Sequence, residues 1–99
     1  MIGPRLASIQ AVAIEDPELQ ARKLADAKAA YSNVIRNATP TTDKALLSLT
    51  FVALGRIYEF SDDNAYATKL YDEAIKLGNI RGGGFKEAMD AKARLIKPH

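Results

Sequence analysis

Residues 51–74 read FVALGRIYEFSDDNAYATKLYDEA, and this stretch decides the fold. On both sides of the polar turn SDDN, apolar residues recur at spacings of three and four, which is the periodicity of an α-helix. The residues in this pattern are Phe51, Leu54, Tyr58, Ala67, Tyr71 and Ala74. The turn itself offers a helix N-cap. The stretch therefore predicts two helices joined as an antiparallel hairpin.

The sequence on either side of this hairpin is also helical in pattern. Pro occurs only between the periodic segments, and Asp16 with Pro17 has the chemistry of a helix start. Gly78 suits the left-handed backbone conformation that commonly follows the last residue of a helix. The predicted helices cover residues 16–38, 42–60, 64–77 and 85–97, with a shorter one at 4–14. We therefore expect a single all-α domain spanning residues 1–99.

The composition excludes most catalytic and metal-binding chemistry. The chain has 99 residues and a formal charge of +2, with 47% hydrophobic and 26% charged residues, as expected for one small globular domain. It contains no Cys, and its single His is the last residue. These counts exclude thiolate sites, Cys nucleophiles and multi-His metal sites. We therefore expect no enzyme activity, no metal or other cofactor, and no small-molecule substrate.

Charged residues give only weak functional signals. Segment 81–99 carries five basic and two acidic residues, but no aromatic residue is interleaved between Lys86 and Lys97. This pattern does not favour a nucleic-acid partner. The run Gly82–Gly84 lacks the Lys-Ser or Lys-Thr of a phosphate-binding loop and is interpreted as a flexible connection.

The spacing of the quoted stretch resembles the tetratricopeptide repeat (TPR). The pattern Phe51-x2-Leu54-Gly55-x2-Tyr58, followed by Ala67, Tyr71 and Ala74, is similar to the repeat signature W-x2-L-G-x2-Y, A-x3-F and A. The match covers residues 48–81, a third of the chain, and the closing Pro of the signature is absent. A plain helical bundle remains the alternative fold.

The resemblance implies a short right-handed array of antiparallel helical hairpins. The divergent hairpin 4–38 would precede the best repeat, and the helix at 85–97 would cap the array. The first helix of each pair would line a concave groove that binds a partner protein or peptide. The groove residues expected from this arrangement are Leu49, Val52, Arg56, Glu59, Phe60, Lys86 and Asp90. Within this set, three apolar residues, Leu49, Val52 and Phe60, are flanked by two basic residues, Arg56 and Lys86. Such a surface suits an amphipathic helix, or an extended apolar peptide with an acidic group.

Oligomerisation is the alternative function. A short helical array has unfinished ends, so the chain could form a homodimer or be a structural part of a larger scaffold. No apolar run approaches the roughly 18 residues of a membrane span, so we expect no transmembrane segment. A complete chain would be cytoplasmic. The resemblance to arrays in bacterial proteins also allows a periplasmic or membrane-tethered fragment.

Overall fold

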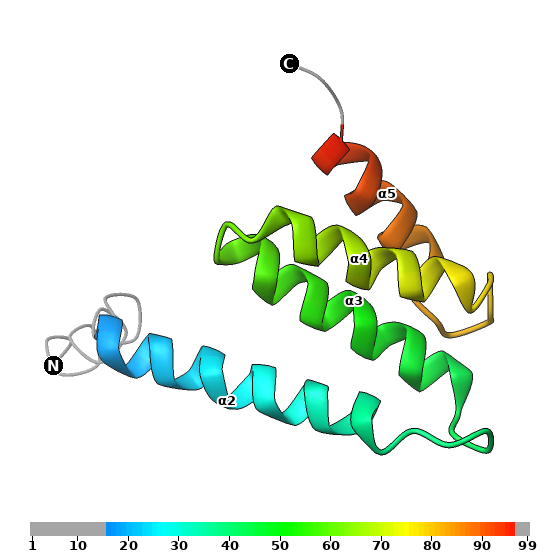
Figure 1. The fold of residues 1–99 in the computed structure, drawn as a ribbon, viewed down its shortest axis with the longest axis horizontal. Coiled ribbons are helices and arrows are strands. Elements are labelled where there is room, and N and C mark those ends of the chain that lie inside the picture. The colour runs from blue at the N-terminus through cyan, green and yellow to red at the C-terminus, as the bar shows by residue number, and fades with distance from the viewer. Residues whose placement is uncertain (1–15, 97–99) are drawn as a thin grey trace, which may run out of the picture.

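The computed structural model describes residues 16–96, which form four α-helices and no strand. The helices are α2 (Pro17–Arg36), α3 (Lys44–Phe60), α4 (Asn64–Lys76) and α5 (Phe85–Ile96). Figure 1 shows that successive helices reverse direction and that α3 lies between α2 and α4. The all-α prediction is confirmed for this part of the chain. The predicted helix at 4–14, and with it the first half of the predicted hairpin 4–38, lies outside the described residues.

Aspartate side chains begin three of the helices. Asp16, Asp43 and Asp63 are the N-caps of α2, α3 and α4, and each carboxylate accepts a hydrogen bond from a backbone N–H of the first turn. These caps satisfy amides that have no partner within the helix. Asp62, just before the cap of α4, has a φ of 66°. Gly78, just after α4, has the expected left-handed conformation, with a φ of 93°.

The core is densest where α3 and α4 cross. A Cβ atom added to Gly55 would lie only 2.7 Å from Cε1 of Tyr71, so the crossing depends on the missing side chain. Tyr71 is fully buried, as are Ala67 and Ala74 one turn to either side of it. Small residues thus let the two backbones approach, and the aromatic ring fills the space between them.

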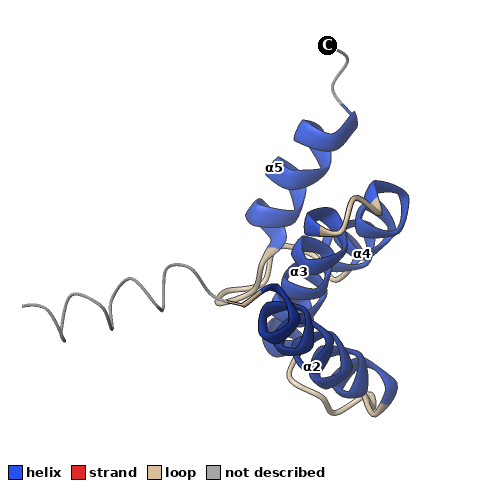
Figure 2. Cartoon of the chain, turned by 90° about the vertical axis from the view of Figure 1, so that its left-hand side faces the viewer, coloured by secondary structure: helices blue, strands red, loops and turns tan. Residues whose placement is uncertain are grey.

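The glycine run before α5 packs against α3. The backbone N–H of Gly84 donates a buried hydrogen bond of 2.9 Å to Oγ of Ser48. A Cβ atom at Gly84 would lie 2.7 Å from Cγ2 of Val52. From the sequence, Gly82–Gly84 is interpreted as a flexible connection, and this packing of Gly84 against α3 is not predicted. The close approach places Ala88 and Ala91 of α5 in the buried core, while the rest of α5 rises away from α2 (Figure 2).

Helix α2 is the least firmly packed of the four. None of its residues is buried, although Leu24, Tyr31 and Ile35 pack as half-buried side chains against α3. The ammonium group of Lys28 lies 4.7 Å from the ring centroid of Tyr58, which adds a cation–π contact. No helix within residues 16–96 has both the length and the apolar character needed to cross a membrane.

Candidate functional site

A concave surface on α3 brings together part of the predicted groove. It lies between α2 and α5, encloses about 350 Å³, and is called here the α2–α5 hollow. Its lining residues are Tyr31, Leu46, Leu49, Thr50, Val52, Ala53, Arg56 and Glu87. Three of the seven predicted groove residues, Leu49, Val52 and Arg56, are therefore among them.

Two leucines supply the accessible apolar surface of the hollow. Leu46 and Leu49 lie one turn apart on α3 and are 50% and 45% exposed. Arg56 and Glu87 add one charge of each sign, and neither forms an ion pair with another described residue. The hydroxyl of Thr50 is already used, because it donates to the carbonyl oxygen of Leu46 at 2.8 Å. Protein interfaces combine an apolar centre with a polar rim and are enriched in Arg, so exposed leucines beside Arg56 fit such a surface.

Val52 departs from the expected exposed position. Only 4% of its surface is accessible, and it belongs to the buried cluster that includes Tyr71 and Ala88. The reason is the approach of Gly84, whose missing Cβ lets the loop before α5 cover the Val52 side chain. Val52 therefore forms the floor of the hollow, and the contacts available to a partner come from Leu46 and Leu49.

Glu59 holds helices together. Its carboxylate accepts a hydrogen bond of 2.8 Å from the hydroxyl of Tyr71 on α4. It also accepts two from the guanidinium of Arg94 on α5, at 3.1 and 3.2 Å. Burial raises the pKa of Tyr71 to about 12, and the hydrogen bond to Glu59 and the charge of that carboxylate act in the same direction. These contacts join three helices and leave Glu59 engaged within the fold.

The remaining predicted groove residues do not line the hollow. Phe60, at the end of α3, is 72% exposed, and Lys86 and Asp90 are exposed on α5. From α5 it is Glu87, the neighbour of Lys86, that reaches the hollow. The rotation of α5 about its own axis decides which of its residues face the hollow. The sequence does not specify this rotation, so Glu87 was not predicted. Leu46 could have been found, since it precedes Leu49 by one helical turn.

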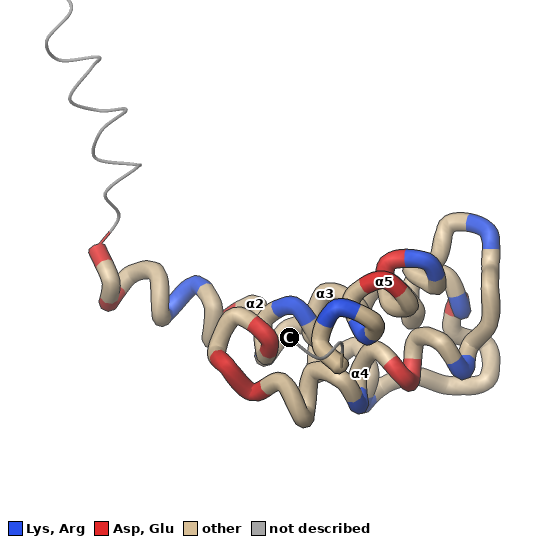
Figure 3. The backbone as a smooth tube through the Cα atoms, turned by 90° about the horizontal axis from the view of Figure 1, so that it is seen from above, with Lys and Arg blue, Asp and Glu red and all other residues tan. Residues whose placement is uncertain are grey.

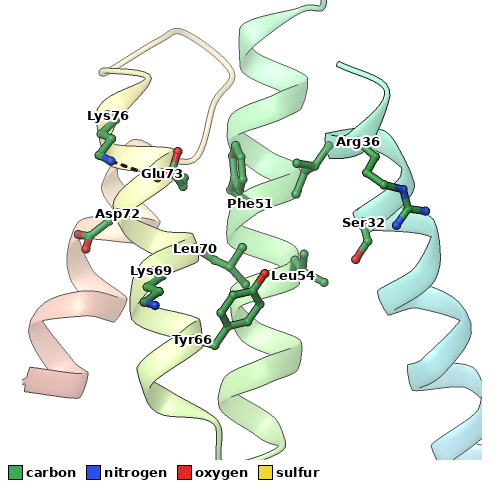
Figure 4. A pocket seen from close by; sticks show the side chains of 11 residues that line it. Ser32, Arg36, Phe51, Leu54, Tyr66, Lys69, Leu70, Asp72, Glu73 and Lys76 are labelled. Atoms are coloured by element: carbon green, nitrogen blue, oxygen red, sulfur yellow. Dashed lines mark hydrogen bonds and ion pairs between the residues drawn. The ribbon is translucent and has the colours of Figure 1, made fainter. Parts of the chain in front are cut away.

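A second depression lies on the other side of α3. It is bounded by α2 and α4, encloses about 630 Å³, and is called here the α2–α4 groove. Figure 4 shows Phe51 and Leu54 of α3 between the two walls, with Leu70 and Tyr66 projecting from α4. The groove was not predicted from the sequence, because Phe51 and Leu54 belong to the apolar periodicity that predicts packing between helices. Leu54 and Leu70 pack closely and are only 3% and 5% exposed, whereas Phe51 and Ile35 are half-buried and Tyr66 is 42% exposed. The accessible apolar surface of the groove therefore comes from Phe51, Ile35 and Tyr66.

Charge is distributed without a dominant sign. Figure 3 shows basic and acidic residues interspersed along the helices. Within residues 16–96, no group of three or more His, Cys, Asp or Glu side chains is placed to hold a metal ion. Both depressions thus offer apolar contact area with individual charged groups at their edges.

The chain has no recognisable relative in the three comparisons made with known proteins. No protein-family model, no curated protein sequence and no solved structure matches it.

Proposed function

We propose that the chain is a protein-interaction module that binds a segment of a partner protein in the α2–α5 hollow. The observation that carries the proposal is the pair Leu46 and Leu49, which remain about half exposed beside a concave surface. When a partner covers exposed leucines that are grouped at a hollow, the burial of their apolar surface stabilises the complex. The unpaired guanidinium of Arg56 would select a partner segment that carries an acidic group.

The TPR-like arrangement is part of this proposal. It is supported by the close crossing of Gly55 with Tyr71 and by the antiparallel order of α3 and α4. In such an array α3 and α5 would be first helices of successive units, and the hollow between them would be the concave ligand face. We propose that α5 caps this array.

A peptide-display selection tests the proposed function. Random peptides are selected on the full chain, and the enriched clones are then measured against Leu49→Asp and Phe60→Asp. Both variants place a carboxylate on an exposed apolar position of α3, but only Leu49 lines the hollow. We expect Leu49→Asp to abolish binding and Phe60→Asp to retain it. Equal binding to the two variants, or no enrichment at all, contradicts the proposal.

Self-association through α5 is the second candidate function, and one observation favours it. Met89 and Ile96 lie seven residues apart on one face of α5 and are 46% and 63% exposed. Light scattering over a wide concentration range measures the mass of the species present. A dimer that becomes monomeric in Met89→Asp would support this alternative, and a monomer at high concentration would exclude it.

A further inference from the structure

The α2–α4 groove has an apolar floor and hydroxyl groups at its sides. The floor is formed by Ile35 and Phe51, which are half-buried, above Leu54 and Leu70, which are only 3% and 5% exposed. Tyr66 is 42% exposed, and Figure 4 shows its ring reaching from α4 toward α3, with Ser32 on the opposite wall. At about 630 Å³ the groove is larger than the α2–α5 hollow and has room for several side chains of a partner.

The acidic residues of this groove are already neutralised. Glu73 pairs with Lys76 at 3.1 Å, and Asp72 pairs with Lys92 of α5. Figure 4 shows Asp72 pointing away from Leu70, toward α5. Consequently neither carboxylate repels an acidic ligand in the groove as an isolated charge would.

Two basic residues are left without an acidic partner, one on each wall. Arg36 on α2 donates only to the neutral Asn33 amide oxygen, at 3.3 Å. Lys69 on α4 is exposed, and no carboxylate within residues 16–96 lies in ion-pair distance of either cation. The groove therefore presents an apolar centre flanked on both sides by uncompensated positive charge.

The walls of the groove determine which secondary structure fits. Both are α-helices, whose backbone N–H and C=O groups are hydrogen-bonded internally, so they offer no sheet edge to an extended peptide. An amphipathic helix instead places apolar residues at i, i+3, i+4 and i+7 along the floor. Acidic residues on its two flanks would then meet Arg36 and Lys69.

A second copy of the chain lacks the required charge. None of the four described helices carries a net negative charge, since α2, α3 and α5 are net basic and α4 is neutral. Nucleic acid is also disfavoured, because only two unpaired cations face the groove and phosphate binding needs more. The complementary ligand is an acidic helix of a different protein.

We propose that the α2–α4 groove is a second docking surface, which binds an amphipathic helix of a partner protein with acidic residues flanking its apolar face. The surface is separate from the α2–α5 hollow, because the two depressions share no lining residue. The proposal therefore stands whether or not the hollow binds a peptide.

Two designed helical peptides test the proposal. They share one leucine stripe, but the first has Glu and the second Lys on both flanks. Binding to the full chain is measured by fluorescence anisotropy, and the site is located by the shifts of backbone amide resonances. We expect the Glu peptide to bind more tightly, to shift amides around Ile35 and Leu70, and to weaken as salt is added.

A charge reversal supplies the decisive variant. Because Arg36 and Lys69 are exposed, Arg36→Glu/Lys69→Glu should keep the helical circular dichroism of the parent chain. Its affinity for the Glu peptide should fall roughly tenfold or more, because attraction is replaced by repulsion. Its affinity for the Lys peptide should rise, because repulsion is replaced by attraction. Lys86→Glu, an exposed change on α5 outside the groove, is the matched control and should alter neither.

Three results would overturn the proposal. The first is failure of the Glu peptide to bind, and the second is equal affinity of the parent chain for both peptides. The third is a set of shifts confined to the amides around Leu46 and Leu49, which would assign the peptide to the hollow.

Discussion

Replacing Gly55 by Ala tests the close crossing of α3 and α4. The new Cβ atom would lie 2.7 Å from Cε1 of Tyr71 and 3.0 Å from two further ring atoms. The ring cannot easily move aside, because it is fully buried and its hydroxyl is held by Glu59 at 2.8 Å. Overpacking of this kind costs about 1–3 kcal/mol.

Helix propensity acts in the opposite direction. Ala is favoured over Gly by about 1 kcal/mol within a helix. The net effect of Gly55→Ala is therefore a loss of about 0–2 kcal/mol in the free energy of unfolding, where an open helical site would gain about 1 kcal/mol. Ala30→Gly, at an exposed position of α2, measures the propensity contribution in this chain.

A double-mutant cycle isolates the contact. Tyr71→Leu removes the aromatic ring, so Gly55→Ala in that background should regain its helix propensity and stabilise by about 1 kcal/mol. Urea unfolding followed by circular dichroism supplies the four stabilities, and the coupling should be about 1–3 kcal/mol. The reasoning is refuted if Gly55→Ala stabilises the parent chain as much as it stabilises the Tyr71→Leu variant. The ring of Tyr71 would then not constrain position 55.

Four other predictions concern single residues. Tyr71 should ionise near its raised pKa of about 12. A pH titration should show this step as a rise in tyrosinate absorbance near pH 12 that is absent in Tyr71→Phe. The folded-state pKa exceeds the unfolded value of about 10, so the stability contributed by this group is present below pH 10 and lost as the pH rises toward 12. Asp63→Ala should lower the free energy of unfolding by about 0.5–2 kcal/mol through loss of the α4 cap. In the same urea titration Asp62→Gly should be neutral or stabilising, because glycine adopts the φ of 66° at this position without strain. Arg94→Ala should cost about 1 kcal/mol or less, since its pair with Glu59 is partly exposed, and a larger loss would show that this pair is needed to hold α5.

The helices could be predicted from the sequence because their signals are local. Asp16 with Pro17, the SDDN turn and Gly78 each mark a helix end through the chemistry of one or two residues. The close crossing at Gly55 was also predictable, because the small residue and Tyr71 fall at matching positions of two adjacent helices. The structure bears out both kinds of expectation within residues 16–96.

The surfaces could not be predicted in the same way, because they depend on helix rotation and on distant contacts. Val52 and Leu49 both fit an outward helical face, and only the packing of Gly84 separates a buried residue from an exposed one. Glu59 has the same ambiguity, since its partners Tyr71 and Arg94 lie on two other helices. The α2–α4 groove depends on the divergence of two helices, which no short sequence pattern encodes.

Helix α2 lines both depressions, so its docking on α3 would couple binding at one to binding at the other. It supplies Tyr31 to the hollow and Ser32, Ile35 and Arg36 to the groove, yet it buries no residue of its own. A ligand that needs α2 in place would raise the population of chains in which it is docked, and so would favour binding at the other depression. Linkage makes this cooperativity reciprocal. Its signature is slower amide hydrogen exchange throughout α2 when either depression is occupied, including residues that touch no ligand.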